Sequence, residues 1–280
     1  MKRVFGLATS LIAASASALA QTPEEMEAYR KMTIFQLGVA VAVNDEPYVG
    51  FNDGDPNILA VPFYVYNKDN LTLAGPNVSY RFWRPLGVQL SAEAKYRFQN
   101  YEEDDSPFLD GLGDRNGTFE VGVKAQKRFD RLRVYAEGFV DTLGNHDGYE
   151  LSTGASFEMA NGRMLSFRPS VGVSYQSQNV IHYYYGVNPG EARTNLAVGD
   201  GTFRDRNAFV VDDGAVTPFA GAQLRLRLSR RLSFQGQVKT AFLPDEIADS
   251  PIVDSSHRTS AFFGVSYALS GPGVIRGQWF

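Results

Sequence analysis

The feature that most constrains this chain is a regular alternation of apolar and polar residues in the stretch LGVQLSAEAKYRFQ, residues 86–99. Seven apolar side chains, from Leu86 to Phe98, alternate with Gly87 and six polar or charged residues. A helix would spread the charged residues around its axis, whereas a strand places all of them on one face. The stretch therefore predicts a β-strand with one apolar and one charged face.

The same period of two recurs along much of the chain. It is clear in residues 119–126 and 223–228, and further segments of this kind lie near 34–43, 58–66, 71–83, 132–142, 148–159, 164–177, 231–242 and 259–269. Most of these further segments are 9 to 14 residues long. Strands of soluble proteins usually have about 5–6 residues, whereas about 9–11 tilted residues cross a bilayer. Strand length therefore favours a membrane barrel.

The connections between these segments alternate between long and short. The long ones are 100–117, 178–216 and 243–258, the short ones are 84–85, 130–131, 160–162 and 229–231, and 143–148 is intermediate. Outer-membrane barrels have short periplasmic turns and longer outward loops. The pattern predicts an all-β, antiparallel transmembrane β-barrel of 10–12 strands, with 12 preferred. A soluble β-sandwich or a lipocalin-like barrel is the alternative.

Two details do not fit a simple barrel. Pro62, Pro76 and Pro169 fall inside strand-like runs, where a residue without an N–H must sit at a bulge or a strand end. Counting hairpins back from the C-terminus also leaves the segment 34–43 without a partner. We therefore expect an error in the assignment of strands in the N-terminal third.

The N-terminus has the order of features of a cleavable export signal. In MKRVFGLATSLIAASASALA, two basic residues precede an apolar run, and Ala18-Leu19-Ala20 forms a small-residue cleavage site. We predict a signal peptide at 1–20, cleaved after Ala20. Thr22, Pro23 and Glu25 form a capping-box pattern that predicts a short periplasmic helical segment at 21–33. The predicted barrel then spans 34–280.

Charge and cysteine content narrow the class of protein further. Signal removal lowers the 27 basic residues to 25, against 31 acidic residues, so the mature chain carries about six net negative charges. Nucleic acid is therefore not an expected partner. The chain has no cysteine, so disulfides do not stabilise it. No segment after the signal approaches the roughly 18 apolar residues of a spanning helix.

Several loop motifs resemble the MltA-interacting protein (MipA/OmpV) family. They are Pro47-Tyr48-Val49-Gly50, DDSPFLDGLGDRNGTFEVG at 104–122, GNHDGYE at 144–150, YYYGVNPGEA at 183–192 and ADSPIVDSSHR at 248–258. The resemblance implies an outer-membrane barrel. For the best-known members it also implies a scaffold that joins a murein lytic transglycosylase to a bifunctional murein synthase. Other members are associated with antibiotic response or adhesion.

One departure from the family pattern concerns the C-terminal end. Family chains tend to stop at an aromatic strand end, whereas here a further SGPGVIRGQWF follows Leu269, so residues 270–280 form either the end of the last strand or an added tail.

The resemblance and the strand pattern together lead to a functional hypothesis. We expect a non-enzymatic scaffold or docking protein for murein-synthesising and murein-hydrolysing machinery. The alternative is a narrow channel for small solutes, or a porin-like protein of the envelope-stress or antibiotic response. Outer-membrane lipid is the expected surrounding of the barrel.

Two related stretches, DSPFLD at 105–110 and DSPIVD at 249–254, lie in long connections separated by an even number of strand crossings. They are therefore expected on the same rim of the barrel, each with Asp-Ser-Pro starting a turn. We expect Asp110 near Arg115 and Asp254 near Arg258. The candidate loop or partner surface consists of Asp105, Ser106, Pro107, Asp110, Arg115, Asp249, Ser250, Pro251, Asp254 and Arg258.

Charged residues of both signs fall on the predicted inward face of the strands. A barrel of this size can fill its interior with paired side chains, so a closed structural interior is the main interpretation and a narrow solute channel the alternative. The predicted lumen charge network consists of Glu93, Lys95, Arg97, Glu120, Lys124, Arg133, Glu137, Arg225 and Arg227. Further inward charges are Asp141, Glu150, Glu158, Arg168 and Lys239.

Catalytic and metal-binding patterns are weak in this sequence. The three histidines, His146, His182 and His257, all fall in connections and lack a lipase or protease spacing. The acidic loop 102–114 does not match the calcium-loop pattern. The sequence predicts no catalytic residue, no metal site and no cofactor.

Overall fold

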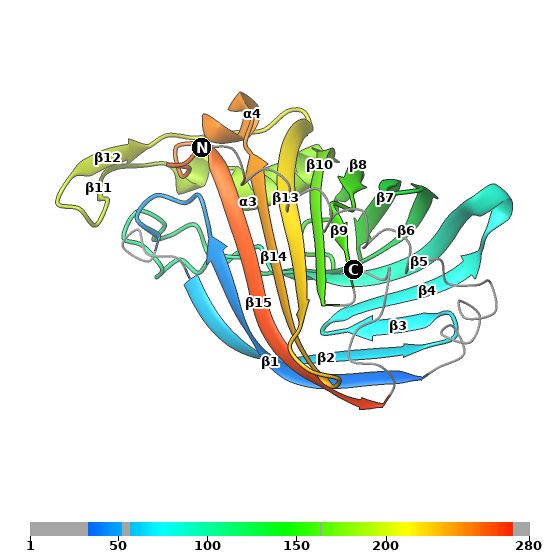
Figure 1. Cartoon of the computed structure of the whole chain (residues 1–280). Helices are drawn as coiled ribbons and strands as arrows, with labels where there is room; N and C mark the ends of the chain where they lie inside the picture. Colours follow the sequence, from blue (N-terminus) through cyan, green and yellow to red (C-terminus); the bar gives the residue numbers. More distant parts are fainter. Residues whose placement is uncertain (1–32, 52–56, 163, 271–280) are drawn as a thin grey trace, which may run out of the picture.

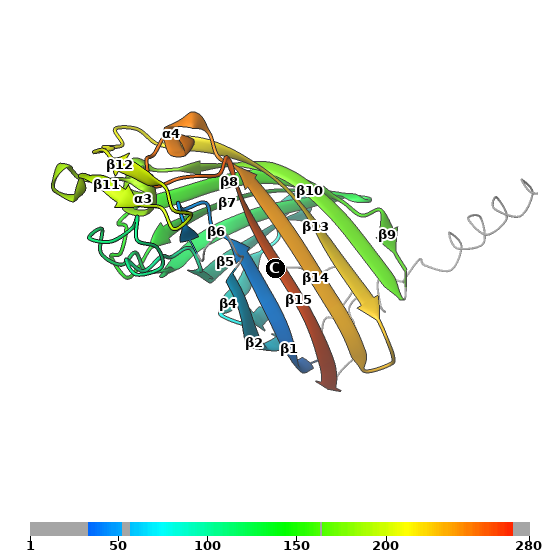
Figure 2. The same ribbon diagram turned by 90° about the vertical axis from the view of Figure 1, so that its left-hand side faces the viewer.

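A computed structural model describes residues 33–51, 57–162 and 164–270, and its main feature is one antiparallel sheet that closes on itself (Figures 1 and 2). Most strands pair with their neighbours in sequence, and the pairings of β15 with β1 and of β13 with β10 complete the ring. Twelve strands form the wall, which confirms the predicted barrel and its preferred strand number. They are β1 (Ile34–Asp45), β2 (Asn57–Lys68), β3 (Leu71–Ala74), β4 (Asn77–Trp83), β5 (Val88–Arg97), β6 (Thr118–Phe129), β7 (Leu132–Asp141), β8 (Tyr149–Phe157), β10 (Leu165–Gln176), β13 (Ala215–Arg227), β14 (Leu232–Phe242) and β15 (His257–Ser270).

Strand β6 shows how the alternating sequence builds this wall. Val121 and Val123 lie on the outside, where 44% and 60% of their surface is exposed, whereas Glu120, the residue before Val121, is fully buried on the lumen side. Successive side chains of a strand point to opposite faces of the sheet. The apolar residues therefore face lipid and the charged residues face the lumen.

The segment 71–83, expected as one strand, consists of two. β3 ends at Ala74 and β4 starts at Asn77, with a turn at Gly75 and Pro76 between them. Gly75 has a φ of +52°, which favours glycine, and Pro76 lacks the N–H that would continue the ladder. The single-strand assignment was wrong, and its correction gives β1 its missing partner.

Pro62 and Pro169 lie where the pairing is one-sided. Pro62 is opposite Val39 of β1, but β3 pairs with β2 only from Val65 onward. Pro169 falls in the interval between β8 and the two-residue strand β9 (Ala160–Asn161), both of which pair with β10. Neither proline sits at the bulge or strand end that was expected; each lies inside a strand at a position that has a ladder partner on one side only, in the described part of the chain.

Long connections meet at one end of the barrel, here termed the outer end. They contain α3 (Gln178–Tyr185), the 3-10 helix η3 (Pro189–Glu191) and α4 (Asp245–Ala248). Buried apolar side chains from four connections form one cluster, termed the outer plug: Tyr48, Val49, Phe51, Tyr101, Phe108, Leu109, Leu112, Val180, Ile181, Tyr184, Tyr185, Val187, Val198, Val211, Ala215, Leu243, Ile247, Ile252 and Val253.

Contacts between tyrosines show that this plug crosses the barrel mouth. Tyr48 follows β1, Tyr101 follows β5 and Tyr185 ends the helix after β10, so the three come from well-separated parts of the wall. The ring of Tyr48 lies 4.7 Å from that of Tyr101 and 5.9 Å from that of Tyr185, measured between centroids. The outer mouth is therefore covered by packed side chains.

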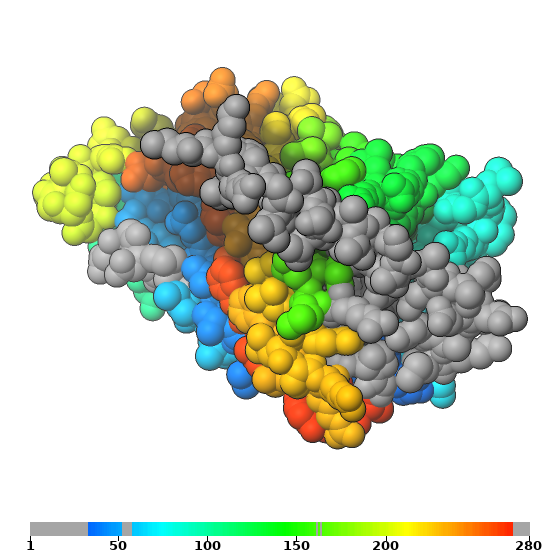
Figure 3. Space-filling view, viewed as in Figure 1, coloured from blue at the N-terminus to red at the C-terminus, as the bar shows by residue number. Residues whose placement is uncertain are grey.

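A hairpin of β11 (Arg193–Ala197) and β12 (Phe203–Arg206) extends from the plug away from the barrel and forms a separate two-stranded sheet. Figure 3 shows it as the yellow-green projection at one side of the molecule. Its outer surface includes Phe203, of which 61% is exposed.

The predicted signal peptide at 1–20, nearly all of the predicted helical segment at 21–33 and the tail from Gly271 lie outside the described residues. They therefore stay predictions. None of the helices in the described part of the chain is long and apolar enough to span a membrane.

Candidate functional site

The two DSP stretches form the same turn at the outer rim. The N–H of Leu109 donates to the carbonyl of Ser106 over 2.9 Å, and the N–H of Val253 donates to the carbonyl of Ser250 over 3.0 Å. Each turn thus has Ser at its first position and Pro at its second, the arrangement that suits a β-turn. The predicted turn chemistry is present in both loops.

A segment after β1 joins these two turns. The hydroxyl of Ser106 donates to the carbonyl of Val49 over 2.8 Å, and the N–H of Val49 donates to the carbonyl of Ile252 over 3.0 Å. Leu109 is fully buried and only 9% of Val253 is exposed. Both loops therefore lie on one rim and share the core of the outer plug, with residues 47–49 bonded to each.

The charged residues of these loops have other partners than expected. Arg115 pairs with Glu191 at 3.2 Å and not with Asp110, whose backbone carbonyl instead accepts a bond from Arg206. Asp254 pairs with Arg204 at 3.0 Å on the exposed rim. The ion pairs of Arg115, Asp254 and Arg258 thus join these loops to other connections, and the expected proximity of Asp110 to Arg115 and of Asp254 to Arg258 stays a prediction.

Arg258 connects the strand wall to the plug through a chain of polar groups. Its Nε lies 2.9 Å from a carboxylate oxygen of Glu46, and its Nη1 donates to Gln99 over 3.0 Å. Gln99 in turn donates to the hydroxyl of Tyr48 over 3.4 Å. Burial raises the pKa of Glu46, and Arg258 opposes this increase. Burial also raises the pKa of the neighbouring Tyr101 to about 12.

Below the plug, the predicted lumen charges form a compact network. Arg97 pairs with Glu120 at 2.8 Å and also with Glu150, and Lys95 lies 3.3 Å from Glu120. The ring of His146 approaches Glu120 to 3.5 Å. Charges taken out of water are costly unless they are paired, so this network braces the wall beneath the plug.

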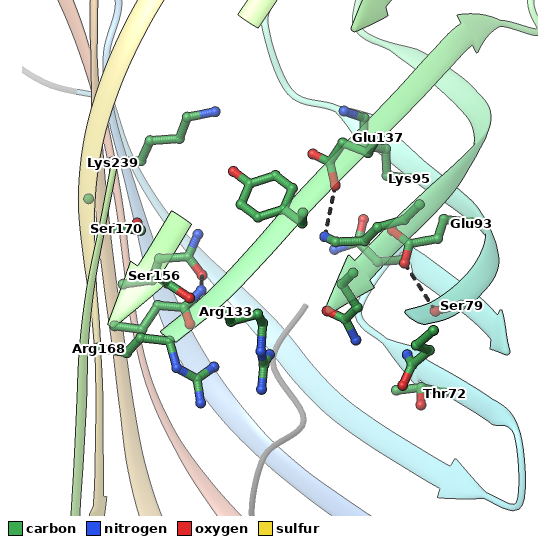
Figure 4. Close-up of a pocket in the computed structure, with 18 of the residues that line it drawn as sticks. Thr72, Ser79, Glu93, Lys95, Arg133, Glu137, Ser156, Arg168, Ser170 and Lys239 are labelled. Carbon is green, nitrogen blue, oxygen red and sulfur yellow. Dashed lines mark hydrogen bonds and ion pairs between the residues drawn. The ribbon is translucent and has the colours of Figure 1, made fainter. Parts of the chain in front are cut away.

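Deeper in the lumen, charged side chains surround a cavity of about 300 Å³ (Figure 4). Lys124 pairs with Glu137 at 2.8 Å, and the hydroxyl of Ser79 donates to Glu93 over 3.3 Å. Nearer the short turns, Glu158 pairs with Arg128 and Arg168. The predicted residues Arg133, Arg225 and Arg227 also lie on this inward face by the alternation of their strands.

Comparison with known proteins supports what the barrel and its loops suggest. The family model of the MltA-interacting protein MipA matches residues 37–269, nearly all of the described chain. The chain belongs to this family. A relative named MltA-interacting protein from Escherichia coli K12 is 29% identical over 238 residues, which cover 83% of this chain and 89% of that protein.

Two further relatives carry names that give a location. The putative outer membrane protein YiaT of Escherichia coli K12 is 25% identical over 233 residues, covering 82% of this chain and 89% of the relative. The outer membrane protein OmpV of Vibrio cholerae is 25% identical over 218 residues, covering 77% and 80%. This MipA-family barrel is accordingly an outer-membrane protein.

A ring nitrogen of each of the three histidines of this MipA-family barrel lies within hydrogen-bonding distance of a nearby backbone or side-chain group. Nδ1 of His146 accepts a hydrogen bond from the N–H of Gly148 over 2.9 Å, His182 lies 3.2 Å from the amide oxygen of Asn188, and His257 lies 3.2 Å from the hydroxyl of Ser255. In the part of the chain that the structure describes, no group of three or more His, Cys, Asp or Glu side chains is arranged to hold a metal ion.

Sequence reasoning missed Arg206, which is fully buried in the outer plug of this family member. Its guanidinium donates to the backbone carbonyls of Phe108, Asp110 and Glu191. It thereby joins the first DSP loop to the connection that follows α3. Alternation around residues 203–206 gives no sign of this role, because the contact depends on loops about a hundred residues apart.

Proposed function

We propose that this MipA-family barrel is a non-enzymatic scaffold that docks murein machinery, first of all a murein lytic transglycosylase, on its periplasmic side. The printed name of its relative, MltA-interacting protein, supports this choice of partner. A bifunctional murein synthase is the proposed second partner.

The observation that carries the proposal is the contrast between the two ends of the barrel. The outer end is covered by a packed apolar plug, whereas a short turn at the opposite end carries Leu86, the most exposed large apolar side chain among the described residues. Leu86 is 93% exposed, Met164 71% and Met159 59%. Exposed apolar side chains that gather at one rim mark an interaction surface. This rim is the one that short turns assign to the periplasm.

Leu86 is the most informative of these residues. It adopts a φ of +48° inside the 3-10 helix η2 (Pro85–Gly87), a conformation that disfavours a side chain as bulky as leucine. Backbone strain of this kind tends to be kept where a functional surface requires it. We take Leu86 as the centre of the proposed docking surface.

The test is in vivo crosslinking followed by purification of the barrel. The double variant Leu86→Asp, Met164→Asp is expected to lose the crosslink to the lytic transglycosylase and to keep the heat-dependent gel shift of a folded barrel. The control is Phe203→Asp, an exposed apolar residue on the outer hairpin. Loss of the crosslink in both variants, or in neither, would contradict docking at the periplasmic rim.

The lumen cavity favours a second candidate function, a narrow channel for small solutes. Its walls carry both signs of charge, and it continues from the short-turn end toward the plug. Planar-bilayer recordings separate the two functions. Stable conductance steps with the purified barrel favour the channel, and silence favours the scaffold.

A further inference from the structure

The wall of the barrel is incomplete between the outer halves of β2 and β5. β2 pairs with β1 from Asn57 to Asn67, but it pairs with β3 only from Val65 to Lys68. β4 reaches β5 only as far as Ala94. Beyond the turn at Gly75, residues 57–63 of β2 and 95–97 of β5 have no strand partner on this side among the described residues. We term this opening the side gap.

The side gap lies at membrane depth. On its outward face, Ala60 and Pro62 are opposite Val41 and Val39 of β1, whose apolar side chains are 39% and 71% exposed. In hydrocarbon, unpaired backbone groups are tolerated only where they are buried in protein or line a water-filled cavity. Pro62 removes one donor from this edge. The gap is therefore best explained as an entrance to the lumen.

Behind the side gap, the lumen surface is apolar. Ala40, Phe63, Val65 and Ala74 form a buried cluster, against which Val61 and Phe262 pack. The rings of Phe63 and Phe262 meet edge to face at 5.2 Å. This apolar wall, formed by β1, β2, β3 and β15, faces the charged wall of β5 to β7. The lumen thus has one apolar and one charged wall, which is the arrangement that an amphiphile requires of a binding site.

Lys239 of β14 provides a positive charge at the outer end of this apolar wall. It forms none of the ion pairs among the described residues, and its ammonium lies 4.3 Å from the centre of the Phe219 ring. Figure 4 shows its side chain apart from the carboxylates of Glu93 and Glu137. Lys239 is opposite Ser260, Ser260 is opposite Asn44, and Asn44 is opposite Asn57. Lys239 is therefore level with the outer end of β2 across the neighbouring strands β15 and β1.

We propose that the side gap admits a single-chain carboxylate amphiphile from the outer leaflet into the lumen. The carboxylate binds Lys239, and the chain lies along the apolar wall past Phe262 and Phe63. The covered outer mouth leaves the side of the barrel as the route from the outer leaflet. The proposal goes beyond the scaffold function and does not depend on it.

Binding is tested with the full mature chain in phosphatidylcholine nanodiscs. Dodecanoate is the probe, and monododecanoylglycerol has the same chain with an uncharged head. Calorimetric titration is expected to show saturable dodecanoate binding. Lys239→Gln weakens it about tenfold, as loss of a charge-assisted hydrogen bond does, and leaves the uncharged probe unaffected. Phe262→Ala weakens both probes. Lys127→Gln, a matched change near the inner end of β6, changes neither.

Two outcomes would overturn the binding site. One is the absence of saturable binding above that of empty nanodiscs. The other is unchanged dodecanoate affinity in Lys239→Gln when the heat-dependent gel shift shows a folded barrel.

Entry through the side gap has its own test, since the native chain contains no cysteine. Val61→Cys lies on the lumen face beside the gap, and Ser170→Cys lines the cavity where β10 is paired on both sides. A phospholipid with a maleimide at the end of one acyl chain is expected to label Val61→Cys faster than Ser170→Cys, and dodecanoate slows that labelling. Equal rates, or faster labelling of Ser170→Cys, would show that the wall is closed.

Discussion

The hydroxyl of Ser106 donates a 2.8 Å hydrogen bond to the backbone carbonyl of Val49, a residue 57 positions earlier in the chain. The hydroxyl oxygen of Ser106 also accepts a hydrogen bond from the N–H of Phe108 over 3.1 Å. One buried side chain thus fixes the first DSP turn and attaches it to the segment that is bonded to the second. The outer plug depends on such contacts between connections, because no single loop can bury its own apolar residues.

Ser106→Ala is expected to destabilise the outer plug by about 1–3 kcal/mol, because it leaves the Val49 carbonyl and the Phe108 N–H without a partner in a buried position. The midpoint of the heat-dependent gel shift measures the change. Ser256→Ala, on the exposed surface of the second loop, is the control and should have no effect. Equal midpoints for the two variants would mean that water replaces the lost bonds.

Arg206→Ala is expected to cost about 2–4 kcal/mol, since it removes the donor shared by the carbonyls of Phe108, Asp110 and Glu191. Limited proteolysis of the refolded barrel should then cut within 98–117 and 193–206. Arg204→Ala is the matched control, because its ion pair with Asp254 is half exposed and such pairs contribute about 0–1 kcal/mol. Similar cleavage of both variants would show that the hairpin alone is the sensitive element.

Glu46 is expected to make stability fall as pH rises. Burial raises its folded pKa above the ordinary value of 4.5, so the folded state holds the proton more tightly than the unfolded state. The resulting loss of stability is absent below the unfolded pKa and grows as the pH rises from about 4.5 through the folded pKa. Glu46→Gln, which imitates the protonated form, should therefore match the native chain at pH 4 and exceed its unfolding midpoint at pH 7. If the native chain gains on the variant instead, the ion pair with Arg258 outweighs burial.

The barrel could be predicted from the sequence because its pattern is local. Within each strand, the alternation of apolar and polar residues shows which side chains face lipid and which face the lumen, as in residues 86–99. The lengths of the connections show which strands form hairpins. The turn that divides 71–83 into two strands was not predicted, because the apolar alternation continues through Gly75 and Pro76. The pair Gly75-Pro76 is itself a turn signal and indicates the division.

The contacts of the plug could not be predicted in the same way. Asp254 pairs with Arg204, 50 positions away, and not with Arg258, which lies closer in the chain. Such pairs depend on how four connections pack together, and one sequence contains no local signal for that packing. The shared rim of the two DSP loops was predictable, since it follows from counting strand crossings.

The lumen provides the last prediction, which compares Glu93→Lys with Glu102→Lys. Glu93 faces the lumen, where the hydroxyl of Ser79 donates to its carboxylate over 3.3 Å. The positive charges of Lys124 and Lys95 lower the cost of burying that carboxylate. A lysine at this position would add a third positive charge to a poorly hydrated interior, at a cost of about 2 kcal/mol. Glu102 is exposed in the loop after β5, where reversal should cost no more than about 0.5 kcal/mol. Unfolding in denaturant after refolding into lipid vesicles measures both, and Glu93→Gln should fall between them. Equal tolerance of the two reversals would mean that the lumen is wide and wet, which would favour the channel over the scaffold.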